Sequence, residues 1–184
     1  MDGRPCAIEG EFVAIKLAGR MEETLQAFAV RAACFIGELD RPFSEEFDGQ
    51  DFSAVHLLAY LGEEPIGTVR IRWFQSFAMP DRLAVMRRFR GHQVGRFLLE
   101  RARALADSRG SKMLYMRVAP QHADYFEEQG WRRLDGKPGA RSSLALVWPI
   151  GPDDTQNDLN TTDAVELWAR YGRAGAAAAP PVLA

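Results

Sequence analysis

The residues best suited to chemistry lie in one segment, LAVMRRFRGHQVGRFLLERARALADSRG, which covers positions 83–110. A β-rich stretch leads through a loop containing arginine and glycine directly into a segment with helical periodicity. The first turn of a helix presents backbone N–H groups without intrahelical acceptors at the positive end of the helix dipole, and phosphates bind there. Gly91 and Gly95 permit close approach of the backbone, and nearby arginines can add charge-assisted hydrogen bonds: Arg87, Arg88, Arg90 and Arg96. The segment predicts a phosphate-binding loop, and a solvated turn with scattered arginines is the alternative.

The formal charge is unevenly distributed, although its sum over 184 residues is only −2. Residues 38–64 hold eight acids and one base, which gives a local charge of −7. Residues 70–96 hold seven arginines and one acid, which gives +6. This arrangement favours a protein that binds an anionic ligand at one place and a cationic ligand nearby. A solvated surface without a ligand is the alternative.

The surrounding pattern predicts the elements that position this loop. β-rich stretches predict strands over 12–17, 55–61, 66–74, 82–87, 113–118, 131–134 and 143–148. Apolar residues at helical spacing predict helices over 22–39, 95–109 and 122–129, with Gly110 ending the second. Residues 43–52 are expected to form a loop or a short helical turn. The order of elements predicts an α/β domain of the layered α+β kind, with a mixed, mostly antiparallel sheet of six to seven strands and about four helices.

Two motifs resemble those of the GCN5-related N-acetyltransferases, the GNAT superfamily. Arg90, Gln93 and Gly95 match the family's acyl-CoA motif R/Q-x-x-G-x-G/A, with Gln93 in place of its first glycine. Residues 125–131, YFEEQGW, are similar to the family's second signature, F-Y-x-x-x-G-F, and likewise follow a predicted strand. The order of elements fits the family from Phe12 to about Trp148. The resemblance implies a GNAT fold and metal-free transfer of an acetyl or acyl group from acetyl-CoA to a primary amine of a small molecule, by direct attack in a ternary complex.

The resemblance also implies which residues bind acetyl-CoA. The strand residues Leu83, Ala84 and Val85 would pair with the pantetheine arm, and a backbone N–H there would polarise the thioester carbonyl. The remaining binding residues would be Arg88, Arg90, Gly91, His92, Gln93, Val94, Gly95, Arg96 and Phe126. Phe126 stands where many relatives have the tyrosine that protonates the leaving thiolate. The preceding Tyr125 lies about 100° away around a helix, and we expect it to point into the core.

Three further roles follow from the resemblance. Asp81 is predicted as the general base, because acids near the start of this strand face the amine in relatives; a turn residue is the alternative. His122 is predicted as a proton relay, with helix capping or simple exposure as the alternative. An acidic wall for a small cationic amine is predicted from Glu45, Glu46 and Asp48, with a solvated loop as the alternative. Two other functions stay open: a catalytically degenerate acyl-CoA-binding regulatory domain, and an acyltransferase similar to homoserine-lactone synthases.

Composition excludes several protein classes. With 23 Lys and Arg against 25 Asp and Glu, the chain is no strongly basic nucleic-acid binder. No stretch approaches the roughly 18 apolar residues of a membrane span, and no apolar signal-peptide core is visible. Cys6 and Cys34 are typical of reduced thiols in a cytoplasmic protein. We expect a GNAT domain over residues 1–150, and over 151–184 a linker, a short helix and a flexible Ala/Pro tail. A homodimer stays open.

Overall fold

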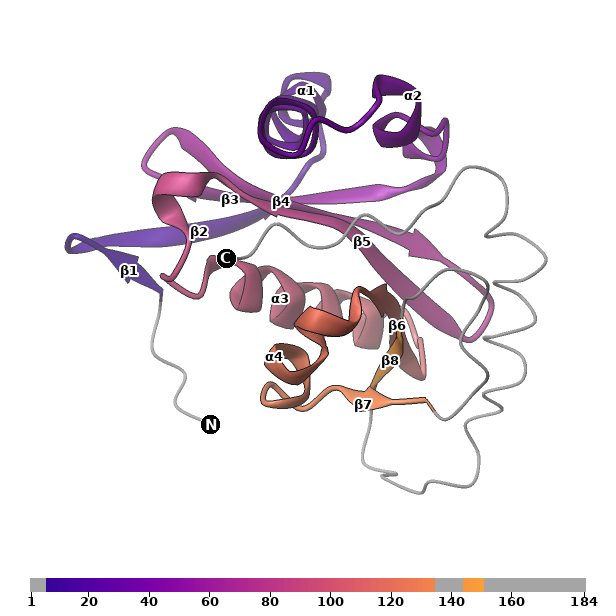
Figure 1. Cartoon of the computed structure of the whole chain (residues 1–184). Coiled ribbons are helices and arrows are strands. Elements are labelled where there is room, and N and C mark those ends of the chain that lie inside the picture. Colours follow the sequence, from indigo (N-terminus) through magenta and orange to yellow (C-terminus); the bar gives the residue numbers. More distant parts are fainter. Residues whose placement is uncertain (1–5, 135–143, 151–184) are drawn as a thin grey trace.

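One mixed sheet forms the centre of the molecule, in the strand order β1-β2-β3-β4-β5-β6-β8-β7 (Figure 1). The computed structural model describes residues 6–134 and 144–150. The strands of this part are β1 (Ala7–Ile8), β2 (Glu11–Leu17), β3 (Val55–Leu61), β4 (Glu64–Trp73), β5 (Phe77–Val85), β6 (Met113–Val118), β7 (Arg132–Arg133) and β8 (Leu144–Pro149). Neighbouring strands in the described sheet run antiparallel except β5 and β6, which are parallel.

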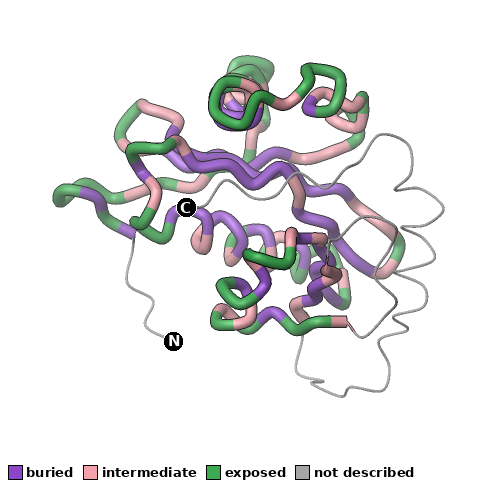
Figure 2. Tube along the Cα trace, in the orientation of Figure 1, coloured by how far each residue is buried: buried purple, intermediate pink, exposed green. Residues whose placement is uncertain are grey.

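Helices cover both faces of this sheet (Figure 1). On one face, α1 (Met21–Arg31) continues into a π-helix over Ala32–Glu38, and α2 (Phe43–Glu46) follows. On the other face lie α3 (Val94–Ser108) and α4 (Ala123–Glu127). Short 3-10 turns occupy Asp51–Ser53, Arg87–Phe89 and Pro120–His122. The sheet is thereby shielded on both sides, and its central strands are buried (Figure 2).

The main core lies between the sheet and α3. Leu98 and Ala102 are spaced four residues apart on α3 and both are fully buried, as the predicted helical periodicity requires. Gly67 on β4 permits the close approach of this helix. A Cβ added at Gly67 would lie only 3.2 Å from the carbonyl oxygen of Ala84 and 3.2 Å from a methyl carbon of Val94. The position of α3 therefore depends on a strand residue without a side chain.

The strands β5 and β6 are joined only near their beginnings. Their register pairs are Phe77 with Met113 and Ala78 with Leu114. Beyond these pairs β5 continues to Val85 and β6 to Val118 without pairing with each other. The two parallel strands therefore part toward their C-terminal ends, where the chain enters the loop before α3.

The predicted fold class is confirmed, with differences in three elements. The described sheet has eight strands rather than six to seven, because two-residue strands such as β1 leave no periodic signal. The helix predicted over 22–39 is α-helical to Arg31 and then π-helical, a change of winding that apolar spacing does not reveal. The strand predicted over 82–87 begins earlier, at Phe77, because Pro80 and Asp81 are typical of turns. The elements predicted over 151–184 lie outside the described residues.

Candidate active site

A pocket of about 120 Å³ opens where β5 ends and the loop to α3 begins. It is lined by the end of β5, by the loop, by the first turn of α3 and by one residue of α4: Val85, Phe89, Arg90, Gly91, Gln93, Val94, Gly95 and Tyr125. The structure thus brings together most of the residues predicted for the acyl-CoA loop. It places them at the end of the gap between β5 and β6.

The backbone of the loop is shaped for an anion. Gly91 and Gln93 have positive φ angles of 83° and 62°, and the chain then enters α3 without a capping hydrogen bond from any described side chain. The first N–H groups of α3 therefore remain available to a ligand. A Cβ added at Gly91 would meet nothing within 4 Å, so the loop faces open space. The carbonyl oxygen of His92 accepts a hydrogen bond from the Cys6 thiol at 3.1 Å, which ties the loop to β1. These features fit the diphosphate of coenzyme A.

The three arginines predicted among the acyl-CoA-binding residues, Arg88, Arg90 and Arg96, already have partners within the protein. Arg90 lines the pocket, but its Nε donates to the carbonyl oxygen of Val85 at 2.9 Å. Its Nη2 lies 2.8 Å from the carboxylate of Glu38, at the end of the π-helix. Arg90 thus anchors the loop. The other two form ion pairs with acidic side chains: Arg88 with Glu64, and Arg96 with Glu100.

Tyr125 and Phe126 occupy places opposite to those predicted. Tyr125 is 40% exposed and lines the pocket, whereas Phe126 is fully buried. The ring of Phe126 packs edge-on against Trp131, with centroids 6.1 Å apart. The predictions that Tyr125 points into the core and that Phe126 contacts the co-substrate are therefore wrong. Phe126 is buried together with Ala123, three residues earlier on α4, so the neighbouring Tyr125 is directed to the pocket.

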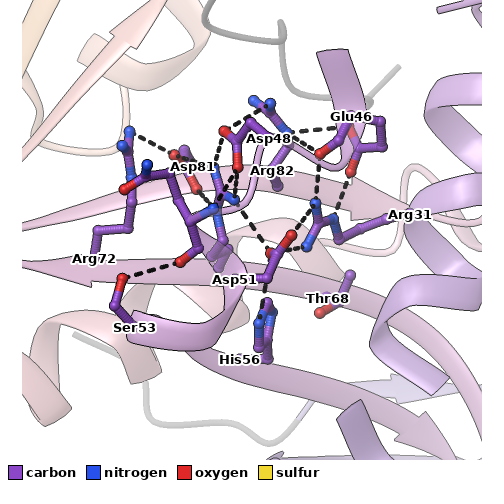
Figure 3. Close-up of polar contacts among 12 residues, drawn as sticks. Arg31, Glu46, Asp48, Asp51, Ser53, His56, Thr68, Arg72, Asp81 and Arg82 are labelled. Carbon is purple, nitrogen blue, oxygen red and sulfur yellow. Dashed lines mark hydrogen bonds and ion pairs between the residues drawn. The ribbon is translucent and has the colours of Figure 1, made fainter. Parts of the chain in front are cut away.

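A buried ion-pair cluster lies on the face of the sheet that carries α1 and α2 (Figure 3). It consists of four arginines, four carboxylates and one histidine: Arg31, Arg70, Arg72, Arg82, Glu46, Asp48, Asp51, Asp81 and His56. Arg31 comes from α1, Arg70 from β4 and Arg82 from β5, while three of the acids come from the segment 46–51. The formal charges of the arginines and the acids cancel.

Arg70 lies at the centre of this cluster. Its Nε is 2.7 Å from the carboxylate of Asp81, and its Nη1 is 2.7 Å from Asp48 and 3.2 Å from Asp51. Burial opposes the ionisation of Asp81, but the charge and hydrogen bonds of Arg70 outweigh it and lower the pKa of this carboxyl. Asp81 also lies 2.8 Å from Arg72. A carboxylate held in this way is a poor proton acceptor, so the geometry favours a structural role for Asp81 over the predicted role of general base.

The predicted acidic wall is mostly taken up by the same cluster. Glu46 is fully buried and lies 2.5 Å from Arg31 and 3.0 Å from Arg82. Asp48 contacts Arg70, and although burial opposes its ionisation, Arg70 lowers its pKa to about 2. Glu46 and Asp48 therefore do not face a cationic acceptor, because arginines of the protein already neutralise them. Glu45, the third predicted acid, is exposed.

Two histidines differ in their surroundings. His56 on β3 is buried, with Nε2 3.7 Å from a carboxylate oxygen of Asp51. Burial, and then the charge of Arg31, lower the pKa of His56 to about 4, so its ring is neutral at pH 7. His122 is partly exposed and directly precedes α4, three residues before Tyr125.

Sequence reasoning misses all four arginines of the cluster, Arg31, Arg70, Arg72 and Arg82, as partners of the acids. A usable signal exists, because the segment with charge −7 and the segment with charge +6 adjoin each other in the chain. β4 and β5 carry most of the arginines of the cluster, and the preceding acidic segment folds over the same strands. The acidic segment and the basic segment thus form ion pairs with each other, and these charges are not left for a ligand.

Among residues 6–134 and 144–150, no group of His, Cys, Asp or Glu side chains could hold a metal ion. No helix of this part of the chain is long and apolar enough to cross a membrane.

Comparison with known proteins agrees with this geometry. YjcF, an uncharacterised N-acetyltransferase of Bacillus subtilis (strain 168), is 26% identical over 121 residues, or 66% of this chain and 86% of that protein. A crystal structure of an acyl-CoA N-acyltransferase from Pseudomonas aeruginosa shares the fold, with a TM-score of 0.65 at 17% identity over 74% of this chain and 99% of that one. The PaiA N-acetyltransferase from Thermoplasma acidophilum, solved in complex with coenzyme A, shares it with a TM-score of 0.55 at 15% identity, over 74% and 99%.

The sequence matches the model of one family across residues 24–131. The match begins within α1 and ends at Trp131, shortly after α4. This match spans more than half of the chain and includes both motifs and the loop that lines the pocket. The chain therefore belongs to the acetyltransferase (GNAT) family.

Proposed function

We propose that this protein transfers an acetyl group from acetyl-CoA to a primary amine of a small molecule, by direct attack within a ternary complex. The observation that carries the proposal is the gap between β5 and β6, which ends at a pocket on the N-terminus of α3. An acyl-pantetheine arm fits such a gap, and a diphosphate fits such a helix start. Family membership supports acyl transfer, and the bound coenzyme A in the PaiA structure supports the choice of donor.

The backbone would hold the donor. Leu83, Ala84 and Val85 have no register partner on β6, so the backbone groups of this stretch that face the gap can pair with the pantetheine amides, except the Val85 carbonyl oxygen, which already accepts from Arg90. The N–H groups from Gly91 to the first turn of α3 would bind the diphosphate. Acetyl-CoA supplies an activated acyl group with a thiolate as its leaving group. A backbone N–H of Leu83–Val85 that donates to the thioester carbonyl would stabilise the developing oxyanion, by about 3 kcal/mol in comparable sites.

Two side chains would move protons. The amine nitrogen forms a bond to the carbonyl carbon, the carbon–sulfur bond breaks, and one proton passes from the nitrogen to the sulfur side. We assign Tyr125 as the proton donor to the leaving thiolate, because it lines the pocket from α4. We assign His122, three residues before Tyr125, to take the ammonium proton through water.

The acceptor is a primary amine that must be neutral when it attacks. The acceptor need not carry an additional positive charge to match Glu46 and Asp48, because arginines already balance both of these buried carboxylates. The alternative of a degenerate acyl-CoA-binding domain rests on Gln93 and Phe126. Gln93 already holds the left-handed backbone of the family's glycine, and Tyr125 supplies a phenol, so neither substitution speaks against catalysis.

The decisive experiment mixes the protein with acetyl-CoA and a panel of primary amines, and follows the release of free thiol. The panel should contain amino acids, polyamines, aminoglycosides and simple aryl and alkyl amines. Calorimetry measures coenzyme A binding in parallel. We expect binding and thiol release with at least one amine class. Tight binding without thiol release for any amine would contradict the enzymatic proposal.

A matched pair of variants tests the loop. Gly91 and Gly110 both have left-handed φ angles, 83° and 75°, and an added Cβ meets nothing within 4 Å at either position. Gly91→Val should therefore strain the backbone as much as Gly110→Val does. Only Gly91→Val should weaken coenzyme A binding, by about tenfold or more. Equal affinities in the two variants would show that the loop is not the diphosphate site.

A further inference from the structure

The strand β5 contains a bulge at Arg82 and Leu83. Thr68 of β4 pairs with Ala84, and Arg70, two residues further along β4, pairs with Asp81. Two residues of β5, Arg82 and Leu83, thus oppose one residue of β4. Neither of the two has a register partner on β4 or β6 in the described sheet. A bulge of this kind leaves a backbone N–H without a ladder partner.

The bulge depends on an unusual backbone conformation. Arg82 has a φ of 51°, in the left-handed region that residues with a side chain rarely adopt. The other non-glycine residues of the described chain with positive φ lie outside the central strands. A strand interior gives no local reason for this conformation, so something else must hold it.

The ion-pair cluster holds it through the Arg82 side chain. This side chain is 1% exposed. Its Nε lies 3.0 Å from the carboxylate of Glu46, and its Nη2 donates to the carbonyl oxygen of Glu45 at 2.6 Å and lies 3.3 Å from Asp48. The guanidinium group is thus fixed from several directions by residues of one segment, 45–48 (Figure 3).

The groups that hold Arg82 are themselves fixed. Glu46 is bound independently by Arg31 of α1, and Asp48 by Arg70 of β4. The position of the guanidinium is therefore set by two other elements of the fold. Three residues further along β5, Val85 lines the pocket. The strained residue, Arg82, thus directly precedes Leu83–Val85, the stretch of strand that would contact the acyl-pantetheine arm.

We propose that Arg82 is a positioning residue for catalysis: its ion pairs with Glu46 and Asp48 hold the β5 bulge, and the bulge aims a free backbone N–H at the thioester carbonyl. The inference rests on the proposed acetyl transfer for its catalytic meaning. Without the guanidinium anchor, Arg82 would relax toward ordinary strand geometry, the N–H would turn back toward β4, and the oxyanion would lose its donor.

The test compares Arg82→Ala with Arg82→Gly. Both variants lose the same ion pairs and leave the same space, but only glycine adopts positive φ without strain. We expect kcat to fall about 100-fold in Arg82→Ala, with KM for acetyl-CoA changed less than threefold. The kcat of Arg82→Gly should be about tenfold higher than that of Arg82→Ala. Arg72→Met removes another arginine of the cluster, one whose backbone is not left-handed. This variant should lower kcat less than tenfold.

Equal kcat values in the alanine and glycine variants would overturn the proposal, because the charge rather than the backbone would then matter. A wild-type kcat in Arg82→Ala would overturn it as well. If neither variant folds, Glu46→Gln provides the test, since it keeps the shape of the side chain and weakens only its ion pairs. It should lower kcat more than it raises KM, and an unchanged kcat would contradict the proposal.

A second readout separates this inference from the proposed function. Amide NMR of wild-type protein and Arg82→Ala reports the bulge directly, in the chemical shift and exchange rate of Leu83, even in protein that transfers no acetyl group. We expect slower exchange in the variant, because a regular ladder protects the amide. An unchanged Leu83 amide would overturn the claim that Arg82 holds the bulge. Absence of thiol release from wild-type protein would instead contradict the proposed function.

Discussion

Arg70 and Asp81 face each other across β4 and β5 and form a two-pronged ion pair, with Nε–Oδ1 and Nη2–Oδ2 distances of 2.7 and 3.0 Å. Parallel contacts of this kind fix the planes of both groups. Asp81, the acid on β5, is thereby part of the scaffold. Our assignment of proton transfer to Tyr125 and His122 instead gives the first prediction.

Asp81→Asn should reduce stability without shifting the pH dependence of catalysis. The substitution leaves Arg70 and Arg72 short of a counter-charge in a buried place, so we expect the free energy of unfolding to fall by about 3 kcal/mol. Denaturant unfolding measures this change. The exposed pair of Asp124 and Arg133 offers a control, since Asp124→Asn should leave the free energy of unfolding nearly unchanged. A displaced acid limb in the kcat/KM profile of Asp81→Asn would restore Asp81 as the base.

Tyr125→Phe should lower kcat about 100-fold, because the variant keeps the ring and loses the proton of the phenol. Coenzyme A affinity should stay within about twofold, since the loop N–H groups are untouched. Steady-state kinetics and calorimetry check both values. The control is Phe126→Leu, which alters the buried neighbour and should cost about 1 kcal/mol of stability with kcat retained. Catalysis by Tyr125→Phe at the wild-type rate would remove the phenol from the mechanism.

Stability should fall as pH drops from 6.5 to 4, because of His56. The pKa of His56 is about 4 in the folded protein, below its ordinary value of 6.5, so the unfolded chain takes up a proton first and is favoured as pH falls. The loss should total about 3 kcal/mol across this window. Unfolding curves at closely spaced pH values measure it. Asp48 acts in a separate, lower window, because its folded pKa of about 2 lies below its ordinary value of 3.8.

Two variants isolate the contribution of His56. His56→Gln should flatten the curve between pH 6.5 and 4, whereas His92→Gln, at an exposed position, should leave it as in the wild type. Parallel curves for His56→Gln and wild-type protein would assign the loss to other groups.

Glu38→Gln should weaken coenzyme A binding about tenfold, although Glu38 itself carries a negative charge. Arg90 joins Glu38 to the carbonyl oxygen of Val85, so the loss of this anchor loosens the loop. Arg90→Lys should produce a similar loss, because lysine cannot make both contacts as a fork. The double variant should be no weaker than either single one, which a thermodynamic cycle from calorimetry shows. If Arg90 bound phosphate directly, Glu38→Gln would leave the affinity unchanged or tighten it.

The elements of the fold follow from local patterns, which is why α3, β3 and β6 lie within one residue of their predicted ranges. The loop at Gly91 and Gln93 follows in the same way, because its function depends on backbone and sequence order. Side-chain direction does not follow. Whether Tyr125 or Phe126 faces the pocket depends on the start of a five-residue helix, and a shift of one residue rotates the face by about 100°. The directions of the Arg90 and Asp81 side chains are likewise decided by partners that are distant in the sequence.

The balance of charge in the buried cluster constrains how this chain can change over time. Four arginines and four carboxylates share one space, and each contacts at least one oppositely charged neighbour. The loss of any one of them leaves an uncompensated buried charge, whereas joint replacement of both partners by apolar residues is tolerated in comparable proteins. Substitutions of these residues should therefore occur in pairs among related sequences. Glu46 and Arg31, or Asp81 and Arg70, should covary in an alignment of the relatives of this protein.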